Sequence, residues 1–170
     1  RDVKIYSIWE GTTYIQSMDL VGRKFNMEKG KPFMRWLTEV GQFIENNKTN
    51  PHFTKEFEVL AEAFQAFSEI LMLLREKMTN GQISFMPLWA TRIMFAMSMV
   101  YCGLLMLEQG MLAQKKLEEV GEDHFDANFY KGKVASARFY LLNEVPNVFS
   151  IKRQFETADL SAVELDPECF

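Results

Sequence analysis

The chain has 170 residues, with 19 Lys and Arg against 23 Asp and Glu, which gives a net charge of −4 at neutral pH. Apolar residues make up 48% of the sequence, which excludes the disordered, collagenous and low-complexity classes and is enough for a domain with its own core. There is no continuous basic run of the kind that nucleic-acid-binding proteins carry, so we expect no nucleic-acid partner.

The first elements in chain order are a short extended stretch and three amphipathic helices. Residues 5–9 are the only stretch that resembles a strand, and they are too few to pair alone. Apolar residues then recur every three or four positions in three segments, which predicts one buried face of a helix in each. The positions are Tyr14, Met18, Val21 and Phe25; Phe33, Leu37, Val40 and Ile44; and Phe57, Leu60, Phe64, Phe67, Leu71, Leu74 and Met78. We expect the third helix to start at Asn50-Pro51 and to end at Asn80-Gly81.

A fourth helix is expected from Pro87 to Gly121, and much of its first half is apolar. Residues 88–107 contain a single charge, Arg92, so this stretch is long enough to cross a membrane. However, no basic cluster flanks it, and the neighbouring helices carry apolar stripes that need a partner. We therefore expect a buried central helix and no membrane span.

The rest of the chain predicts two further helices and an irregular acidic tail. Ala127, Tyr130, Val134, Ala137 and Leu141 share a helical face until Pro146, residues 148–155 are amphipathic, and residues 157–170 are acidic. The fold class is therefore all-α, an antiparallel bundle of four to five helices preceded by a short extended segment. Most of the eleven Met lie in the apolar stripes, which favours core filling over an adaptable binding groove. The apolar face of residues 55–78 is a candidate for an exposed interface.

Residues that could bind a metal or act as a nucleophile are few. His52 and His124 lack a carboxylate at the spacing of a di-iron bundle site, so we expect both at the surface and no metal. Cys102 and Cys169 lie far apart, which indicates free thiols in a reducing cytoplasm. The first residue is Arg1 rather than Met and no targeting pattern follows, so we expect a piece of a longer, cytoplasmic protein.

The most informative segment surrounds Glu10 and Gly11. A purely structural interpretation makes it the start of a helix. Thr13 with Gln16 fits a capping box, Ser7 with Glu10 fits a second one, and Gly11 eases the turn. A functional interpretation makes Glu10 a base whose pKa is raised by burial against Trp9, with Gly11 leaving room for a ligand. The residue types alone leave both interpretations open.

Residues 1–16 read Arg-Asp-Val-Lys-Ile-Tyr-Ser-Ile-Trp-Glu-Gly-Thr-Thr-Tyr-Ile-Gln. This segment closely resembles the motif near the C-terminus of acyl-CoA dehydrogenases, in which Tyr usually stands where this chain has Trp9. Residues 19–24 resemble the larger branch of that family, which includes 3-methylmercaptopropionyl-CoA and long-chain-type dehydrogenases and adds a helical C-terminal region. The resemblance implies that residues 1–26 end the catalytic domain and that residues 27–170 form an accessory helical bundle.

The resemblance also implies an activity and the residues that carry it. Glu10 matches the catalytic base that removes the α-proton of an acyl-CoA while the β-hydride passes to FAD. Gly11 matches a position beside the bound substrate, and Thr12 and Thr13 match positions that touch FAD. Tyr14 occupies a position commonly filled by Asn or Gln, which also contacts the cofactor.

Partners follow from the same resemblance. They are an acyl-CoA substrate, an electron-transfer flavoprotein or similar acceptor, and further copies of the full-length enzyme in a homo-oligomer. Because the rest of the flavin site lies in domains outside this sequence, we expect the chain alone to be inactive and to hold no FAD. The alternative is a non-enzymatic helical interaction or scaffold module in which residues 10–12 are only a helix cap.

Overall fold

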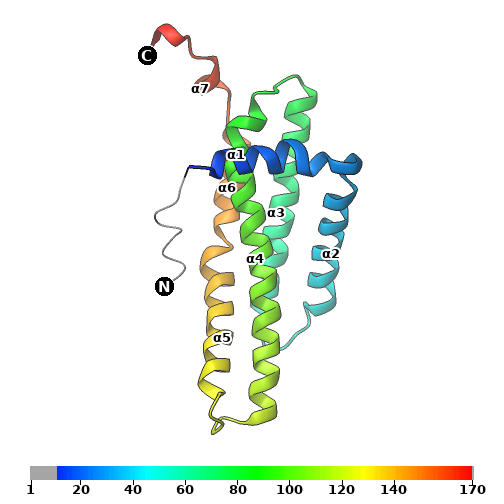
Figure 1. The fold of residues 1–170 in the computed structure, drawn as a ribbon, viewed down its shortest axis with the longest axis vertical. Coiled ribbons are helices and arrows are strands. Elements are labelled where there is room, and N and C mark those ends of the chain that lie inside the picture. The colour runs from blue at the N-terminus through cyan, green and yellow to red at the C-terminus, as the bar shows by residue number, and fades with distance from the viewer. Residues whose placement is uncertain (1–10, 170) are drawn as a thin grey trace.

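Four helical rods run alternately up and down, and a further helical segment crosses them near one end (Figure 1). The computed structural model describes residues 11–169. The crossing segment comprises α1 Thr13–Met18, the π-helical turn η2 Asp19–Arg23 and the 3-10 turn η3 Lys24–Gly30. The rods are α2 Lys31–Asn47, α3 Thr54–Thr79, α4 Phe85–Val120, and α5 Ala127–Phe139 continued through η4 Tyr140–Glu144 into α6 Asn147–Thr157. A short helix α7 Ser161–Glu164 and the turn η5 Pro167–Cys169 follow. The predicted all-α antiparallel bundle is confirmed.

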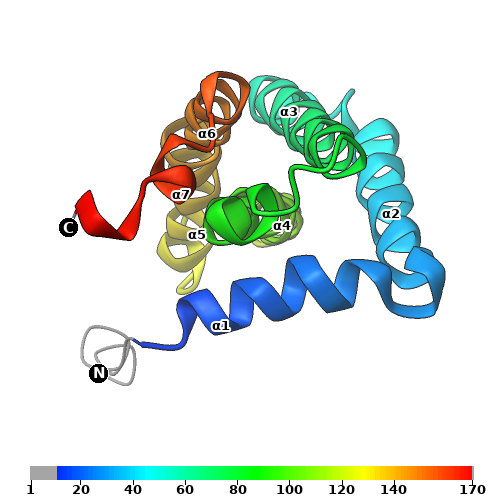
Figure 2. The same cartoon turned by 90° about the horizontal axis from the view of Figure 1, so that it is seen from above.

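Helix α4 lies at the centre of the bundle, and α1, α2, α3, α5 and α6 surround it (Figure 2). Ile93, Val100 and Leu107 are fully buried, whereas Phe95 and Leu105 are exposed. By length and composition alone, α4 is also apolar enough to cross a membrane. The predicted central helix is thus confirmed, although it is not buried all round. The absence of a membrane span stays a prediction.

Two glycines of α4 allow close approach to its neighbours. A Cβ atom added at Gly110 would lie 2.8 Å from the Cβ of Ala137 on α5 and 3.1 Å from Cζ of Phe53. A Cβ atom added at Gly103 would lie 3.0 Å from Cγ2 of Val145. Residues seven apart lie on the same side of a helix, so both glycines form part of one stripe. This stripe brings the backbone of α4 close to the rod formed by α5 and α6.

The turn between α2 and α3 makes α3 start later than predicted. The side-chain oxygen of Asn50 accepts a hydrogen bond from the His52 N–H at 3.0 Å, and its carbonyl accepts one from the Phe53 N–H at 3.2 Å. An Asn side chain bonded two residues ahead stabilises a turn rather than a first helical turn. Helix α3 therefore begins at Thr54, and Pro51 lies in the turn.

Other predicted boundaries shift by less. Helix α4 begins at Phe85, so Pro87 lies in the first turn, where its missing N–H leaves no intrahelical bond unmade. The tail, predicted to be irregular, contains the short helical turns α7 and η5. The last predicted helix, residues 148–155, is confirmed as α6.

The apolar face of α3 is mainly core rather than an exposed interface. Phe57, Leu60 and Phe67 have no exposed surface, so the prediction of an interface there is wrong for most of the helix. The other helices cover this face, because α3 contacts α2, α4 and α6. Phe64 and Leu71 are half-buried, and the face becomes exposed at its C-terminal end, where 38% of Met78 is accessible.

The prediction that most methionines pack into the core is confirmed in part. Six of the eleven are partly buried and pack against the core: Met18, Met86, Met97, Met99, Met106 and Met111. None of the eleven is fully buried, and Met27, Met34, Met72 and Met78 are exposed. The fully buried positions are taken by alanine and by branched and aromatic side chains, which have fewer accessible rotamers than the flexible Met side chain.

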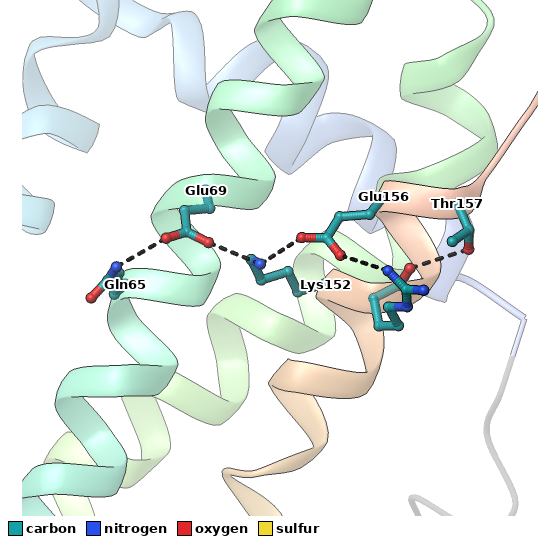
Figure 3. Close-up of polar contacts among 6 residues, drawn as sticks. Gln65, Glu69, Lys152, Glu156 and Thr157 are labelled. Atoms are coloured by element: carbon teal, nitrogen blue, oxygen red, sulfur yellow. Dashed lines mark hydrogen bonds and ion pairs between the residues drawn. The ribbon is translucent and has the colours of Figure 1, made fainter.

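A chain of polar side chains joins α6 to α3 (Figure 3). The Nζ atom of Lys152 lies 3.0 Å from Oε2 of Glu69 and 2.5 Å from Oε1 of Glu156. Gln65 donates a hydrogen bond to Glu69 at 3.0 Å. The pKa of Glu69 is lowered mainly by the hydrogen bond from Gln65 and next by that from Lys152. The pKa of Glu156 is lowered mainly by the hydrogen bond from Lys152. Lys152 is therefore shared by two carboxylates on different helices.

We predict opposite effects of alanine at two helical glycines. Gly110→Ala should lower the free energy of unfolding by about 1–3 kcal/mol, because the added methyl group has no room between α4 and α5. Gly132→Ala in α5 is the control, since its Cβ would meet no atom within 4 Å. It should raise the free energy by up to about 1 kcal/mol through helix propensity. Urea unfolding followed by circular dichroism measures both, and stabilisation by both variants would contradict close packing at Gly110.

We predict that Lys152→Gln raises the pKa of Glu156 more than that of Glu69. Glu156 loses the largest cause of its lowered pKa and keeps only the 3.5 Å contact with Arg153, whereas Glu69 keeps its largest cause, the bond from Gln65. A carboxyl group with a lowered pKa in the folded state stabilises the fold above its ordinary pKa of 4.5, and this stability is lost as the pH falls through the lowered value. The variant should therefore lose less stability on acidification than the parent protein. NMR titration of the carboxyl carbons measures the pKa values.

Lys55→Gln is the matched control for this experiment. Lys55 is exposed near the opposite end of α3 and makes no ion pair with any residue from 11 to 169. The pKa values of Glu69 and Glu156 should be unchanged in Lys55→Gln. If Lys55→Gln raised them as much as Lys152→Gln does, the pKa shifts would not come from the local contacts of Lys152.

Candidate functional site

The segment that the sequence singled out lies at the start of α1. Glu10 lies outside the described residues, so its role stays a prediction. Gly11, Thr12, Thr13 and Tyr14 are described and form the approach to α1 and its first turn. Gly11 has a φ of +148°, a conformation that favours glycine, and a Cβ there would meet no atom of the described residues within 4 Å. The position after Glu10 thus combines backbone freedom with open space.

The helix start differs from the predicted capping box. Thr12 occupies the N-cap position and its side chain caps no backbone N–H. Its hydroxyl instead accepts a hydrogen bond from Nε2 of Gln16 at 3.0 Å, and its carbonyl accepts one from the Gln16 N–H at 2.9 Å. The capping box of Thr13 and Gln16 is therefore wrong, because Thr13 is already the first helical residue. The second box, which involves Ser7 and Glu10, lies outside the described residues.

The outer face of this first turn is accessible. Tyr14 and Ile15 are 54% and 67% exposed, Thr12 is exposed, and Thr13 is half-buried. The large side chains of Tyr14 and Ile15 are therefore exposed to solvent close to Gly11. Such exposure is typical of a surface that contacts another group.

Ser17 fixes the inner face of the same segment to α4. Ser17 is fully buried, and its hydroxyl donates to the Tyr14 carbonyl oxygen at 2.7 Å and lies 3.1 Å from Oγ1 of Thr91. Because a hydroxyl has one proton, the bond to Tyr14 requires Thr91 to donate to Ser17. Sequence reasoning missed this pair, since the two residues lie 74 positions apart in helical stripes that are otherwise apolar.

Asp19, the next acidic residue after Glu10, is engaged by neighbouring cations. Arg23 donates to it at 2.9 Å from Nη2, and the Nζ atom of Lys24 lies 3.9 Å away. The hydrogen bond from Arg23 lowers the pKa of Asp19, so this carboxylate is held in its ionised form. A lowered pKa weakens a carboxylate as a base, so Asp19 does not resemble a second general base.

The other candidate residues are at the surface, as predicted. The side chains of His52 and His124 are 43% and 44% exposed, and Nε2 of His52 lies 3.2 Å from Oε1 of Glu118. Cys102 and Cys169 are free and exposed, which confirms the prediction of unpaired thiols. Between residues 11 and 169, no group of three or more His, Cys, Asp or Glu side chains is arranged to hold a metal ion.

Comparison with known sequences gives consistent matches. The family described as "Acetyl-CoA dehydrogenase C-terminal like" matches residues 36–166. Two butyryl-CoA dehydrogenases of Syntrophomonas wolfei subsp. wolfei are 52% and 47% identical to the chain, over 99% and 100% of its length. A broad-specificity linear acyl-CoA dehydrogenase of Mycobacterium tuberculosis is 29% identical over 100% of it. The chain spans only 27% to 28% of the length of these relatives.

We predict that Ser17→Ala detaches the first turn of α1 from α4. The change removes one donor and leaves the Thr91 hydroxyl without its acceptor, so the free energy of unfolding should fall by about 1–3 kcal/mol. Amide hydrogen exchange of residues 12–18 should also become faster. Ser98→Ala is the control, because Ser98 is exposed and donates only to the Met94 carbonyl on its own helix. Its effect should stay within about 0.5 kcal/mol, and equal effects of the two variants would contradict a tertiary role for Ser17.

Proposed function

Since the chain belongs to the acetyl-CoA dehydrogenase C-terminal-like family, we propose that it forms the C-terminal part of an FAD-dependent acyl-CoA dehydrogenase. One observation carries this proposal: the family match over residues 36–166 follows, in one chain, a segment with the acyl-CoA dehydrogenase motif around Glu10. The proposed reaction is the α,β-desaturation of an acyl-CoA thioester. The chain spans about a quarter of its relatives, so the activity belongs to the longer protein and the chain alone is inactive.

Within this proposal Glu10 is the catalytic base. The α-C–H of a thioester is a weak acid, so its removal needs a carboxylate whose pKa is raised in a site that excludes water. Glu10 takes this proton as the β-hydrogen leaves with its electron pair, and the carbons are left joined by a double bond. When bound, FAD supplies the acceptor for that hydride. Trp9 precedes Glu10 in the sequence, and an aromatic side chain that packs against a carboxyl group raises its pKa.

The first turn of α1 fits a partial contact with substrate and cofactor. Gly11 has open space beside it for the acyl-CoA, and Thr12 and Thr13 offer hydroxyl groups. Tyr14 presents an exposed ring, in place of the amide that is common in the family. Thr12 and Tyr14 are exposed and Thr13 is half-buried, and in this proposal the remainder of the flavin site belongs to the longer protein. We propose that Gly11 contacts substrate and that Thr12, Thr13 and Tyr14 contact FAD.

The bundle serves as a support for this catalytic segment. Ser17 bonds the Tyr14 carbonyl and Thr91, so the turn that follows Glu10 is held on the central helix. A base that must meet one C–H bond requires such positioning. We place the division between the end of the catalytic domain, residues 1–26, and the accessory bundle, residues 27–170, at the corner before α2.

The proposal includes partners of the longer protein. They are the acyl-CoA substrate, an electron-transfer flavoprotein or similar acceptor for the electrons of the reduced flavin, and further copies of the enzyme in a homo-oligomer. We place the protein in the cytoplasm.

We predict that Glu10→Gln in the full-length protein retains FAD and loses catalysis. Glutamine keeps the size and polarity of glutamate but cannot accept the α-proton, so turnover should fall by about 10²–10⁴-fold. Exchange of the α-proton of an acyl-CoA with solvent should be lost in parallel. Visible absorbance of the purified protein measures the flavin, and NMR of the acyl-CoA in D₂O measures the exchange.

Glu62→Gln is the control, because Glu62 is an exposed carboxylate on α3 without an ion pair to any residue from 11 to 169. It should retain both flavin and turnover. Near-normal turnover of the Glu10→Gln variant would contradict the catalytic role. A full-length protein that binds no flavin would favour the alternative, a helical interaction or scaffold module.

A further inference from the structure

A groove of about 670 Å³ lies between α3 and the corner that leads from η3 into α2. Phe25, Phe33, Leu71 and Leu74 contribute to its apolar lining. Its size is within the range of about 300–1,000 Å³ that is typical of small-molecule sites. It is formed by residues different from those around Glu10, so what it binds does not depend on the proposed function.

The charged lining of this groove has one sign. Lys29 and Arg75 line it, and no Asp or Glu is among its described lining residues. Neither Lys29 nor Arg75 makes an ion pair with any residue from 11 to 169. Of the five Lys and Arg in residues 23–35, Arg23 and Lys24 pair with Asp19 and Arg35 pairs with Glu39, so Lys29 and Lys31 are the two without an ion pair to residues 11–169. Uncompensated cations beside an apolar groove are complementary to a ligand with an apolar body and an anionic end.

The backbone that presents Lys29 is strained. Glu28 and Lys29 have φ values of +50° and +59°, and Gly30 continues the left-handed stretch at +81°. Residues other than glycine rarely adopt this conformation, and two in succession persist only where the surroundings hold them. The rings of Phe25 and Phe33 stack across the corner with centroids 3.9 Å apart, which closes the loop that contains the strained turn. The turn thus positions Lys29 at the groove.

The exposed Met side chains add an adaptable apolar wall. Met34 and Met78 line the groove and are 60% and 38% exposed. Met is flexible and polarizable, so it can follow the shape of an alkyl chain. Met34 and Met78 therefore belong to this surface rather than to the core.

We propose that this groove binds a single-chain fatty carboxylate. The alkyl chain lies along Phe25, Phe33 and Leu71, and the carboxylate is bound by Lys29 and Arg75. A docked protein helix would need an extended groove that accepts side chains over two or more turns. An open groove of about 670 Å³ with both cations among its lining residues fits a small amphiphile better.

The test uses a photoreactive laurate, with a diazirine on its alkyl chain, and the full-length protein. After irradiation and proteolysis, mass spectrometry should find the label in peptides that contain residues 21–34 or 71–79. Unlabelled laurate should compete for this labelling, and dodecanol should not, because it lacks the negative charge. Absence of label from both peptides would overturn the proposal, and so would competition by dodecanol equal to that by laurate. A groove that accepts only a partner protein's helix would give the first of these results.

Variants of the two cations test the charge requirement at this site alone. Lys29→Gln combined with Arg75→Gln should weaken the competition by laurate for labelling of these peptides about tenfold, because two charge-assisted contacts are lost. Lys29→Arg combined with Arg75→Lys keeps both charges and should retain most of the affinity. Lys55→Gln, at the opposite end of α3, should have no effect. Circular dichroism verifies the fold of each variant, and unchanged laurate affinity in the double Gln variant would overturn the proposal.

Discussion

The close approach of α4 to the rod formed by α5 and α6 is the constraint on which the rest of the structure depends. A side chain at position 110 of α4 would collide with Ala137, so this position is occupied by Gly110. Gly103 likewise lies close against Val145. With α4 held so near this rod, the other helices can surround it and use it as their common packing partner (Figure 2). Interiors pack at near-crystalline density, so the position of this helix sets the positions of its neighbours.

The crossing segment that precedes α2 is connected to the central helix α4 by a hydrogen bond near its start and by aromatic contacts near its end. Near its start, Ser17 forms a buried hydrogen-bonded pair with Thr91. Near its end, Phe25 stacks on Phe33 of α2. Phe33 stacks on Trp36 of the same helix, and Trp36 packs edge-on against Tyr101 of α4. A directional bond specifies an orientation, whereas stacked rings contribute mainly buried area. The segment therefore presents the turn after Glu10 at one end and the strained corner at the other.

Helices were predictable from the sequence because their apolar periodicity is a local property that tertiary packing preserves. The stripe that contains Leu60 and Phe67 marks α3 correctly, and the apolar run of residues 88–107 marks the central helix. Helix starts were less predictable, since the turn at Asn50 depends on side-chain hydrogen bonds that compete with the first helical turn. Of the candidate site, the residues around Glu10 were recognisable as a motif, but the contact between Ser17 and Thr91 was not. Nothing local to either residue distinguishes it from an ordinary polar residue in a helix.

The corner at residues 28–30 is the feature that local sequence rules describe least well. Glu28 and Lys29 are poor choices for a left-handed backbone, where Gly or Asn is usual, so local preference and fold disagree there. Such disagreements occur where the surrounding structure over-determines the backbone, and here the stacked rings of Phe25 and Phe33 do so. A glycine in place of Lys29 would relieve the strain, but it would remove one of the two cations that line the groove. The left-handed backbone at Lys29 is thus the energetic cost of having a cation at this groove. For this reason we interpret the strained corner as part of a binding surface rather than as a packing defect.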